Sequence, residues 1–408
     1  MSSADDHMVS EGAKAPKHKT EKIYGRNRPT MGWRRYIATL MIKLGRPNWA
    51  PQPSRAEQDK LRLFALKKKA WRLMDEVKSL VIVVFNFKGG SGKTPIAAYL
   101  SCMLAELVKV PVAFVDGNPG SAPPGYRMAA WGGKEPQPWV RNDVPIIGMD
   151  RQTATVLDLY NDLEKKVVTD GHTLQYAMRQ NHDGVATLVA DPDVRGMTDD
   201  QKLKLMQRVL GFVRDHYRVV IVDTGNDFTT DTQKDLAHMG TDLVFPAYVP
   251  MKDAITDLTT TLNELSITNK EKVANGIIVF SGLNKWKFDD SLKRKNRRRP
   301  WELASDYEAR LGRRRVASYW GVPYDPAIEN ESSVRLDLIR DDTYEALLNV
   351  LIAILERNVA ANKNETSQLP QDAATDENAV TSVEDKLSPQ PQPYREPTEE
   401  EALMRSFS

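Results

Sequence analysis

The sequence has few of the residues that build covalent or metal-held frameworks. Its 408 residues include one cysteine, Cys102, and six histidines. A single cysteine excludes an intramolecular disulfide and is typical of a chain kept in a reducing compartment. The histidines are scattered without metal-ligand spacing, and no Ser-His-Asp order stands out. We therefore expect neither a zinc site nor a catalytic triad.

Long apolar runs are also missing. No run approaches the roughly 18 residues that a membrane-spanning helix needs. The first 20 residues are polar and lack the apolar core of a signal peptide. We therefore expect a cytoplasmic protein, and association with the nucleoid or with a membrane surface stays open.

The net charge is close to zero, at +2, but the charge is unevenly distributed. Residues 1–72 hold 17 Lys and Arg against 6 Asp and Glu, whereas residues 361–408 hold 4 against 10. Charged segments of this kind are typical of interaction arms. We predict a disordered basic arm over residues 1–30 and a disordered acidic tail over residues 361–408.

Residues 31–79 are predicted to form a helical N-terminal extension. Its first helix carries an apolar stripe with basic neighbours, formed by Trp33, Ile37, Leu40, Met41 and Leu44. Three fates for residues 31–46 stay open: packing on the rest of the chain, lying on an anionic membrane, or docking a partner protein.

A second helix is predicted in the same extension. Ser54 and Glu57 have the spacing of a capping box at its start. Leu66, Ala70, Leu73 and Val77 then recur at helical period.

Between residues 80 and 360, apolar strands alternate with helical patterns. Near-continuous Val and Ile runs are expected for strands buried on both faces of a parallel sheet. The expected strands are Val81–Asn86, Val112–Asp116, Ala186–Ala190, Val219–Asp223, Asp242–Ala247, Gly276–Ser281 and Ser318–Val322. The sequence therefore predicts an α/β fold with a doubly wound, mostly parallel sheet of the P-loop NTPase type, plus the helical extension.

The stretch VIVVFNFKGGSGKTPIAAYL, residues 81–100, carries the strongest functional signal. A strand, a glycine-rich turn and a helix in this order place backbone N–H groups around phosphate oxygens. Lys93 is expected to reach the β- and γ-phosphates, and the Thr94 hydroxyl to coordinate Mg²⁺. The sequence predicts a nucleotide site here.

The motif KGGSGKT resembles the deviant Walker A loop of the ParA/MinD class of P-loop ATPases. The resemblance implies ATP and Mg²⁺ as cofactors and a homodimer that closes around two ATP molecules. In that class the first lysine, here Lys88, reaches the partner's phosphates. The residues implied in ATP binding are Lys88, Gly89, Gly90, Ser91, Gly92, Lys93, Thr94 and Pro95.

Further segments extend the resemblance over about residues 80–357. VAFVDGNPG resembles the second acidic motif and makes Asp116 and Asn118 candidate catalytic residues. RVVIVDTGNDF resembles a Walker B strand, so Asp223 is expected in the Mg²⁺ shell. VFSGLNKW resembles the base-reading segment, which makes Asn284 a candidate adenine contact.

Two positions depart from the class pattern. Pro95 stands where Thr is common, but proline is tolerated in the first turn of a helix. Asn118 stands where the class has an aspartate that orients water. An amide orients water but does not accept its proton, so either Asp116 compensates or hydrolysis is slow.

A narrower resemblance is to MinD-like ATPases encoded with type VII secretion systems. It is carried by a GWRR helix, a PQPSRAE connector, KGGSGKT and the downstream Asp-x-Asn-Pro. In that subgroup an Asn before Pro is ordinary.

Residues 284–315 hold 12 Lys and Arg and 5 Asp and Glu. Arg297, Arg298 and Arg299 are candidate contacts to a DNA backbone, with a solvated loop as the alternative. Three functions stay open: an ATP-dependent switch in DNA partitioning or cargo positioning, an assembly ATPase of a secretion or conjugation apparatus, and a non-hydrolysing nucleotide-binding scaffold.

Overall fold

The structure is a computed structural model. It describes residues 32–44, 54–108, 111–118, 140–141, 144–145, 155–181, 183–225, 230–283, 300–311, 318–330 and 334–367. The chain divides into two compact units, Met1–Asn362 and Lys363–Ser408. Asn284, the three arginines Arg297–Arg299, the predicted disordered arm 1–30, and residues 368–408 of the predicted disordered tail 361–408 lie outside the described residues.

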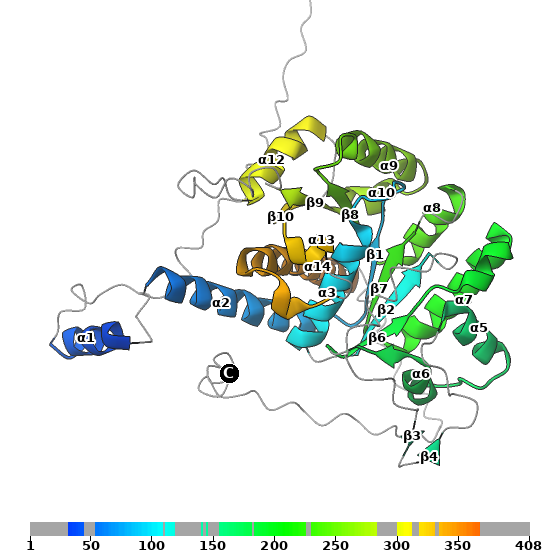
Figure 1. Ribbon diagram of the computed structural model, residues 1–408, viewed down its shortest axis with the longest axis horizontal. Helices are drawn as coiled ribbons and strands as arrows, with labels where there is room; N and C mark the ends of the chain where they lie inside the picture. Colours follow the sequence, from blue (N-terminus) through cyan, green and yellow to red (C-terminus); the bar gives the residue numbers. More distant parts are fainter. Residues whose placement is uncertain are drawn as a thin grey trace, which may run out of the picture. The chain divides into compact units, whose positions relative to one another are not determined.

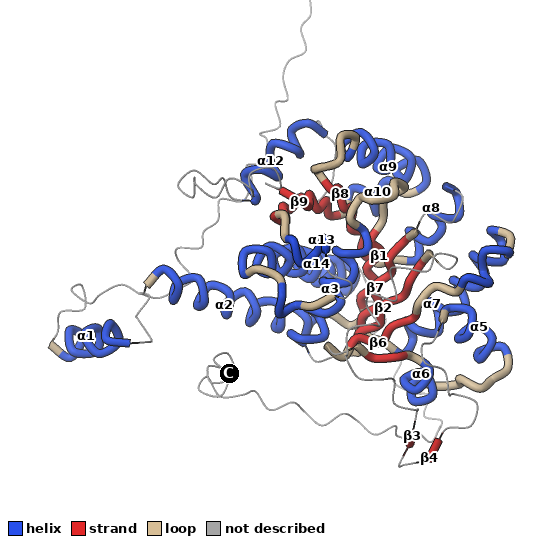
Figure 2. The backbone as a smooth tube through the Cα atoms, viewed as in Figure 1, coloured by secondary structure: helices blue, strands red, loops and turns tan. Residues whose placement is uncertain are grey.

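An eight-stranded sheet forms the centre of the first unit (Figures 1 and 2). Its order is β10-β9-β8-β1-β7-β2-β6-β5. Every pairing is parallel except that of β5 with β6. The strands are β1 Leu80–Val84, β2 Val112–Gly117, β5 Arg179–Gln180, β6 Val185–Leu188, β7 Val219–Thr224, β8 Asp242–Tyr248, β9 Ile277–Leu283 and β10 Ser318–Pro323.

Helices cover both faces of this sheet, as Figure 1 shows for α3 and α14 against α5 and α7. The helices are α1 Gly32–Lys43, α2 Arg55–Glu76, α3 Lys93–Val108, α5 Val156–Glu164, α6 Gly171–Ala177, α7 Asp199–His216, α8 Thr230–Met239, α9 Ala254–Thr268, α10 Lys270–Ala274, α12 Pro300–Leu311, α13 Pro326–Asn330 and α14 Asp341–Ser367. Shorter elements are β3 Val140–Arg141, β4 Val144–Pro145 and the 3₁₀ turns η2 Pro192–Gly196 and η4 Leu336–Leu338.

The alternation of side chains along β1 separates two hydrophobic layers. Val81 and Val83 join the cluster that includes α5, α7 and α9. Ile82 and Val84 join the cluster that includes α2, α3 and α14. All five residues of β1 are buried, because a central parallel strand has helices on both faces. The predicted doubly wound, mostly parallel α/β fold is confirmed.

The second predicted helix of the extension packs on the layer formed by α3 and α14. The Ser54 hydroxyl accepts a hydrogen bond from the backbone N–H of Glu57, at 3.2 Å, and caps the start of α2. Ala70 and Val77 are fully buried in the same cluster as α3. At the other end of α2, the Arg218 guanidinium donates to the carbonyl of Val77 at 2.9 Å. The helix α2 therefore packs against the helices that cover one face of the sheet.

The last helix continues beyond residue 360, into residues 361–367 of the predicted disordered tail. α14 runs to Ser367, because Ala360, Ala361 and Lys363 are good helix formers that extend the helix after its last buried residues. Among the described residues, no helix is long and apolar enough to span a bilayer.

Candidate functional site

The glycine-rich loop begins at the end of β1 and is anchored by Asn86. The buried Asn86 carboxamide donates to the carbonyl of Pro246 at 2.9 Å. Its oxygen accepts from the backbone N–H of Lys88 and from the hydroxyl of Thr261, each at 3.0 Å. Two neighbouring elements, β8 and α9, thus hold the first turn of the loop in place.

Two glycines give the loop its shape. Gly90 has φ +74° and Gly92 has φ +90°, a region that residues with a Cβ rarely adopt. A Cβ on Gly92 would also lie 3.1 Å from the Ser281 hydroxyl oxygen. The loop therefore needs glycine for its backbone angles and, at Gly92, for its close approach to β9.

Lys93 opens α3 with its side chain turned back over the loop. Its ammonium donates to the carbonyl of Lys88 at 2.9 Å. Burial lowers the pKa of Lys93 to about 8, although attraction to the Asp223 carboxylate raises this pKa in part. A phosphate oxygen at this place would favour the charged ammonium, so the site suits an anion.

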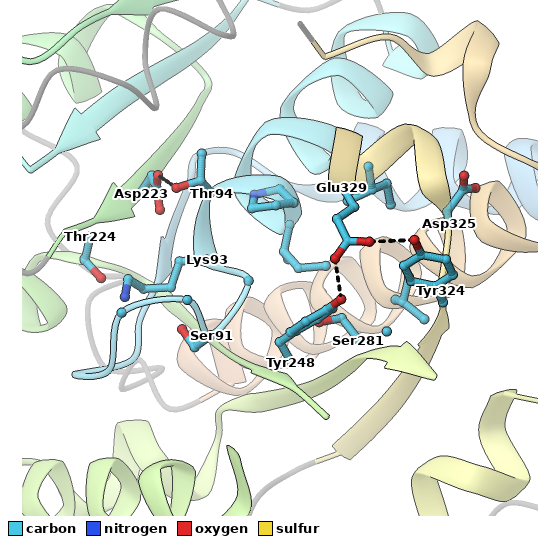
Figure 3. Close-up of a pocket in the computed structure, with 18 of the residues that line it drawn as sticks. Ser91, Lys93, Thr94, Asp223, Thr224, Tyr248, Ser281, Tyr324, Asp325 and Glu329 are labelled. Carbon is cyan, nitrogen blue, oxygen red and sulfur yellow. Dashed lines mark hydrogen bonds between the residues drawn. The ribbon is translucent and has the colours of Figure 1, made fainter. Parts of the chain in front are cut away.

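Thr94 and Asp223 lie side by side at the carboxyl edge of the sheet (Figure 3). The Thr94 hydroxyl donates to one carboxylate oxygen of Asp223 at 2.6 Å. Burial raises the pKa of Asp223 to about 6, although the Thr94 hydrogen bond and the Lys93 charge lower this pKa in part.

The other Asp223 oxygen is buried, with no hydrogen-bond partner among the described residues. A hydroxyl beside a carboxylate oxygen with spare acceptor capacity fits Mg²⁺, which takes few protein ligands and completes its shell with water and phosphate. The described residues contain no cluster of three or more His, Cys, Asp and Glu for another kind of metal site.

The second acidic motif reaches the site through Asn118. Asn118 lines the same cavity as Lys93. Its backbone N–H donates to the Asp116 carboxylate at 3.0 Å, and Asp116 itself is fully buried and does not line the cavity. Gly225 packs directly against the Asn118 side chain, since an added Cβ would lie 1.7 Å from Asn118 Cγ. The amide is therefore the group that this motif presents to a ligand.

Aromatic side chains form the far end of the cavity. The hydroxyl of Tyr248, on β8, donates to Glu329 at 3.1 Å, and the hydroxyl of Tyr324, after β10, donates to the other Glu329 oxygen at 2.5 Å (Figure 3). Val322 and Ile328 add apolar surface. Apolar and aromatic walls with a few directed polar groups suit a nucleotide base.

Two buried hydroxyls lie between these ends. Ser91 Oγ and Ser281 Oγ line the cavity and have no hydrogen-bond partner among the described residues. The cavity encloses about 360 Å³, within the usual size of a small-molecule site. Both serines thus have hydrogen-bonding capacity for a bound molecule.

The structure gathers most of the predicted site residues around this one cavity. Those that line it are Gly89, Gly90, Ser91, Gly92, Lys93, Thr94, Pro95, Asn118 and Asp223. Lys88 is exposed and does not line it, although its carbonyl accepts the Lys93 bond. α3 runs without interruption through Pro95.

Sequence reasoning missed Tyr248 and Ser281. One signal could have found them. Tyr248 lies at the end of β8 and Ser281 near the end of β9, at the carboxyl edge of the predicted sheet where ligands bind. Tyr324 and Glu329 lie in the segment VPYDPAIEN, directly after β10 and in α13.

Comparison with known proteins gives likenesses in structure only. No protein-family model matches the chain, and no curated protein matches its sequence. Among solved structures, a ParA family ATPase from Chlorobium tepidum is 13% identical with a TM-score of 0.46, over 67% of this chain and 99% of that one. McdA from Cyanothece, solved as an ATP complex, is 14% identical with a TM-score of 0.45, over 68% and 97%.

The septum site-determining protein MinD from Pyrococcus horikoshii, solved with Mg-ADP, is 18% identical with a TM-score of 0.39, over 71% of this chain and 100% of that one. At these identities the likeness is one of fold. The solved structures that this chain is similar to include ParA and MinD proteins.

Proposed function

We propose that this protein is a Mg²⁺- and ATP-binding switch ATPase of the ParA/MinD class. One observation carries the proposal: Lys93, Thr94 and Asp223 meet at the mouth of a glycine loop whose backbone angles only glycine adopts readily. This arrangement binds a polyphosphate and a hard cation at one end of a cavity that has an apolar and aromatic other end.

Each group has a distinct part in binding. The Lys93 ammonium meets the β- and γ-phosphates, replacing its bond to the Lys88 carbonyl. Backbone N–H groups of the loop and the Ser91 hydroxyl take phosphate oxygens. Thr94 and Asp223 would hold Mg²⁺, which supplies charge neutralisation between the phosphates.

Lys88 is proposed to act outside its own cavity. Its backbone is fixed by Asn86, while its side chain is exposed at the surface of the loop. An exposed cation on a rigid loop beside a nucleotide site is placed to reach the phosphates of a second copy. We therefore infer a homodimer that closes around two ATP molecules.

A slow or non-hydrolysing switch is the second candidate function, and Asn118 favours it. The motif presents an amide to the cavity, whereas Asp116 is buried behind it and accepts the Asn118 backbone N–H. A buried carboxylate that does not line the cavity does not contact a water on the γ-phosphate directly. Turnover is therefore expected to be slow.

Light scattering with and without ATP tests the switch. The wild type is expected to become dimeric with Mg-ATP, and Lys88→Ala to bind ATP and stay monomeric. Lys204→Ala, a lysine 70% exposed on α7, is the matched control and is expected to dimerise normally. An ATP-bound dimer of normal stability in Lys88→Ala would contradict the exchange of lysines between copies.

The cellular role is proposed as DNA partitioning or cargo positioning, with an assembly role in a type VII-like secretion or conjugation apparatus as the alternative. The DNA contacts proposed are Arg297, Arg298 and Arg299. Replacing all three by Ala is expected to weaken DNA retention uniformly across sequences and to flatten its salt dependence. Unaltered filter binding at low salt would contradict DNA binding through these arginines and favour the protein-directed role.

A further inference from the structure

Helix α1 presents an apolar stripe that the described residues leave exposed. Tyr36 is 78% exposed, Leu40 52%, Leu44 60% and Ile37 36%. At 3.6 residues per turn, these positions share one side of the helix. Intramolecular packing, one of the three fates expected for residues 31–46, would bury this stripe. None of the described segments covers these four side chains.

The second helix of the extension shows what a packed helix looks like in this protein. On α2, Lys67 pairs with Glu106 at 3.1 Å and Lys69 pairs with Glu356 at 2.6 Å. Ala70 and Met74 of α2 are buried, and Leu63, Leu66, Trp71 and Leu73 pack half-buried against the same cluster, whereas Phe64 is 37% exposed. The helix α1 has the same amphipathic spacing as α2, but Tyr36, Leu40 and Leu44 on its apolar side are more than half exposed.

The charge around α1 has one sign. Between Glu21 and Glu57 the chain has eight Lys and Arg and no Asp or Glu. These cations are spread along residues 22–55 and continue on both sides of the helix. A segment of this kind is attracted by a broad anionic surface, and its attraction weakens with salt.

We propose that α1 is an interfacial helix that binds anionic lipid bilayers, with the Tyr36–Leu40–Leu44 side in the lipid and Lys43 at the headgroups. An apolar stripe with basic flanks and no acidic residue is the pattern of helices that lie in a membrane interface. DNA offers anionic charge but no apolar phase for the stripe. A protein groove would need a matching shape, whereas a bilayer takes a helix of about 18 Å without one.

This proposal stands apart from the nucleotide function. Nothing in α1 belongs to the phosphate-binding cavity. Lys93→Ala is therefore expected to bind vesicles as the wild type does, so that a failure of nucleotide binding and a failure of lipid binding are separate results.

Co-sedimentation of the full chain with vesicles, without nucleotide, tests the proposal. Vesicles of phosphatidylcholine are compared with an equimolar mixture of phosphatidylcholine and phosphatidylglycerol. The wild type is expected to bind the anionic vesicles at least tenfold more tightly, and to lose most of this preference at about 1 M salt, where the screening length is roughly 3 Å.

The variants distinguish the stripe from a general apolar effect. Leu40→Glu is expected to weaken binding to the anionic vesicles by about tenfold or more, because it places a carboxylate in the lipid-facing stripe. Ile267→Glu, at an 82% exposed position on α9, is the matched control and is expected to bind as the wild type does.

Equal binding to both vesicle types, or undiminished binding by Leu40→Glu, would overturn the proposal. A Leu40→Glu variant that keeps vesicle binding and loses retention on DNA would overturn it in favour of nucleic acid. Loss of a dimer by the same variant in light scattering, with vesicle binding absent from the wild type, would assign the stripe to a second copy of this chain.

Discussion

The two ends of the cavity are built in different ways. The phosphate end comes from one continuous segment, residues 89–96, and from residues at the ends of β2 and β7, with backbone angles that only glycine adopts readily and with buried charges. The base end comes from side chains of β8, β9, β10 and α13, joined by hydrogen bonds of Tyr248 and Tyr324 to Glu329. The phosphate end therefore depends on backbone geometry and charge, whereas the base end depends on which side chains the neighbouring elements carry.

This difference predicts that changes at the two ends have different consequences. Damage at the phosphate end is expected to lower the affinity for all nucleoside triphosphates together. Damage at the base end is expected to alter the preference between bases while phosphate binding persists.

The largest effect is expected from Gly92→Val. The branched side chain would be forced into φ +90° and against the Ser281 hydroxyl, so the loop cannot keep its shape. Affinity for ATP and GTP is expected to fall about a hundredfold for each, measured by calorimetric titration.

Gly211→Ala on α7 is the matched control, since an added Cβ there meets nothing within 4 Å. It is expected to bind normally and to stabilise the helix by about 0.5–1 kcal/mol. Retained ATP affinity in Gly92→Val would show that the loop does not hold phosphates.

A smaller loss is expected from Asp223→Asn, which keeps the shape of the side chain and removes its charge. The Thr94 hydroxyl keeps an oxygen acceptor, whereas the cation loses its carboxylate ligand. Mg-ATP affinity is expected to fall about tenfold, and EDTA to weaken ATP binding less than it does in the wild type. An unchanged effect of EDTA would place the cation elsewhere.

Asn118→Asp is expected to raise the steady-state rate of ATP hydrolysis by about tenfold. The new carboxylate would line the cavity where the amide now lies and accept a proton from water, and general-base assistance is worth roughly 10²–10⁴-fold in good geometry.

Asn118→Ala is the companion variant, expected to lose water orientation without gaining a base. Dimerisation is measured in parallel so that assembly is not mistaken for chemistry. Equal or lower turnover in Asn118→Asp, with weaker ATP binding, would mean that the new charge repels the γ-phosphate.

The smallest effect is expected from Glu329→Gln at the base end. An amide can accept from one tyrosine hydroxyl but presents N–H groups to the other, so the second bond must reverse its direction and that tyrosine proton loses its carboxylate acceptor. The ratio of ATP to GTP affinity is expected to change about fivefold in competition binding, and the affinity for inorganic triphosphate to stay the same.

Glu164→Gln, at a 56% exposed position on α5, controls for the loss of one surface charge. A parallel loss of ATP, GTP and triphosphate affinity in Glu329→Gln would show that both ends act as one unit.

The same division explains what the sequence predicts well. The loop from Lys88 to Thr94 is a local pattern, and its glycines and Lys93 serve a fixed backbone geometry. The seven predicted strands are present with ends shifted by at most two residues, because runs of Val and Ile buried on both faces leave a strong signal. Asp223 follows such a run, and its role is implied by the resemblance of RVVIVDTGNDF to a Walker B strand.

The parts that were missed depend on tertiary structure. Tyr248 and Ser281 reach the cavity because β8 lies beside β1 and β9 lies beside β8, an order that no local pattern carries. The antiparallel β5 has only two residues and no periodicity to read. The extension shows the same limit, since α1 and α2 are both amphipathic and only the structure separates a covered helix from one with an exposed stripe.

The central claim is that this cavity binds Mg-ATP through Lys93, and isothermal titration of the full chain with Mg-ATP tests it most directly. Wild type and the Lys204→Ala control are expected to bind one ATP per chain with equal affinity. Lys93→Ala is expected to lose about a hundredfold or more, because a buried charge that meets the β- and γ-phosphates is removed. Equal affinity in Lys93→Ala and wild type would contradict the account.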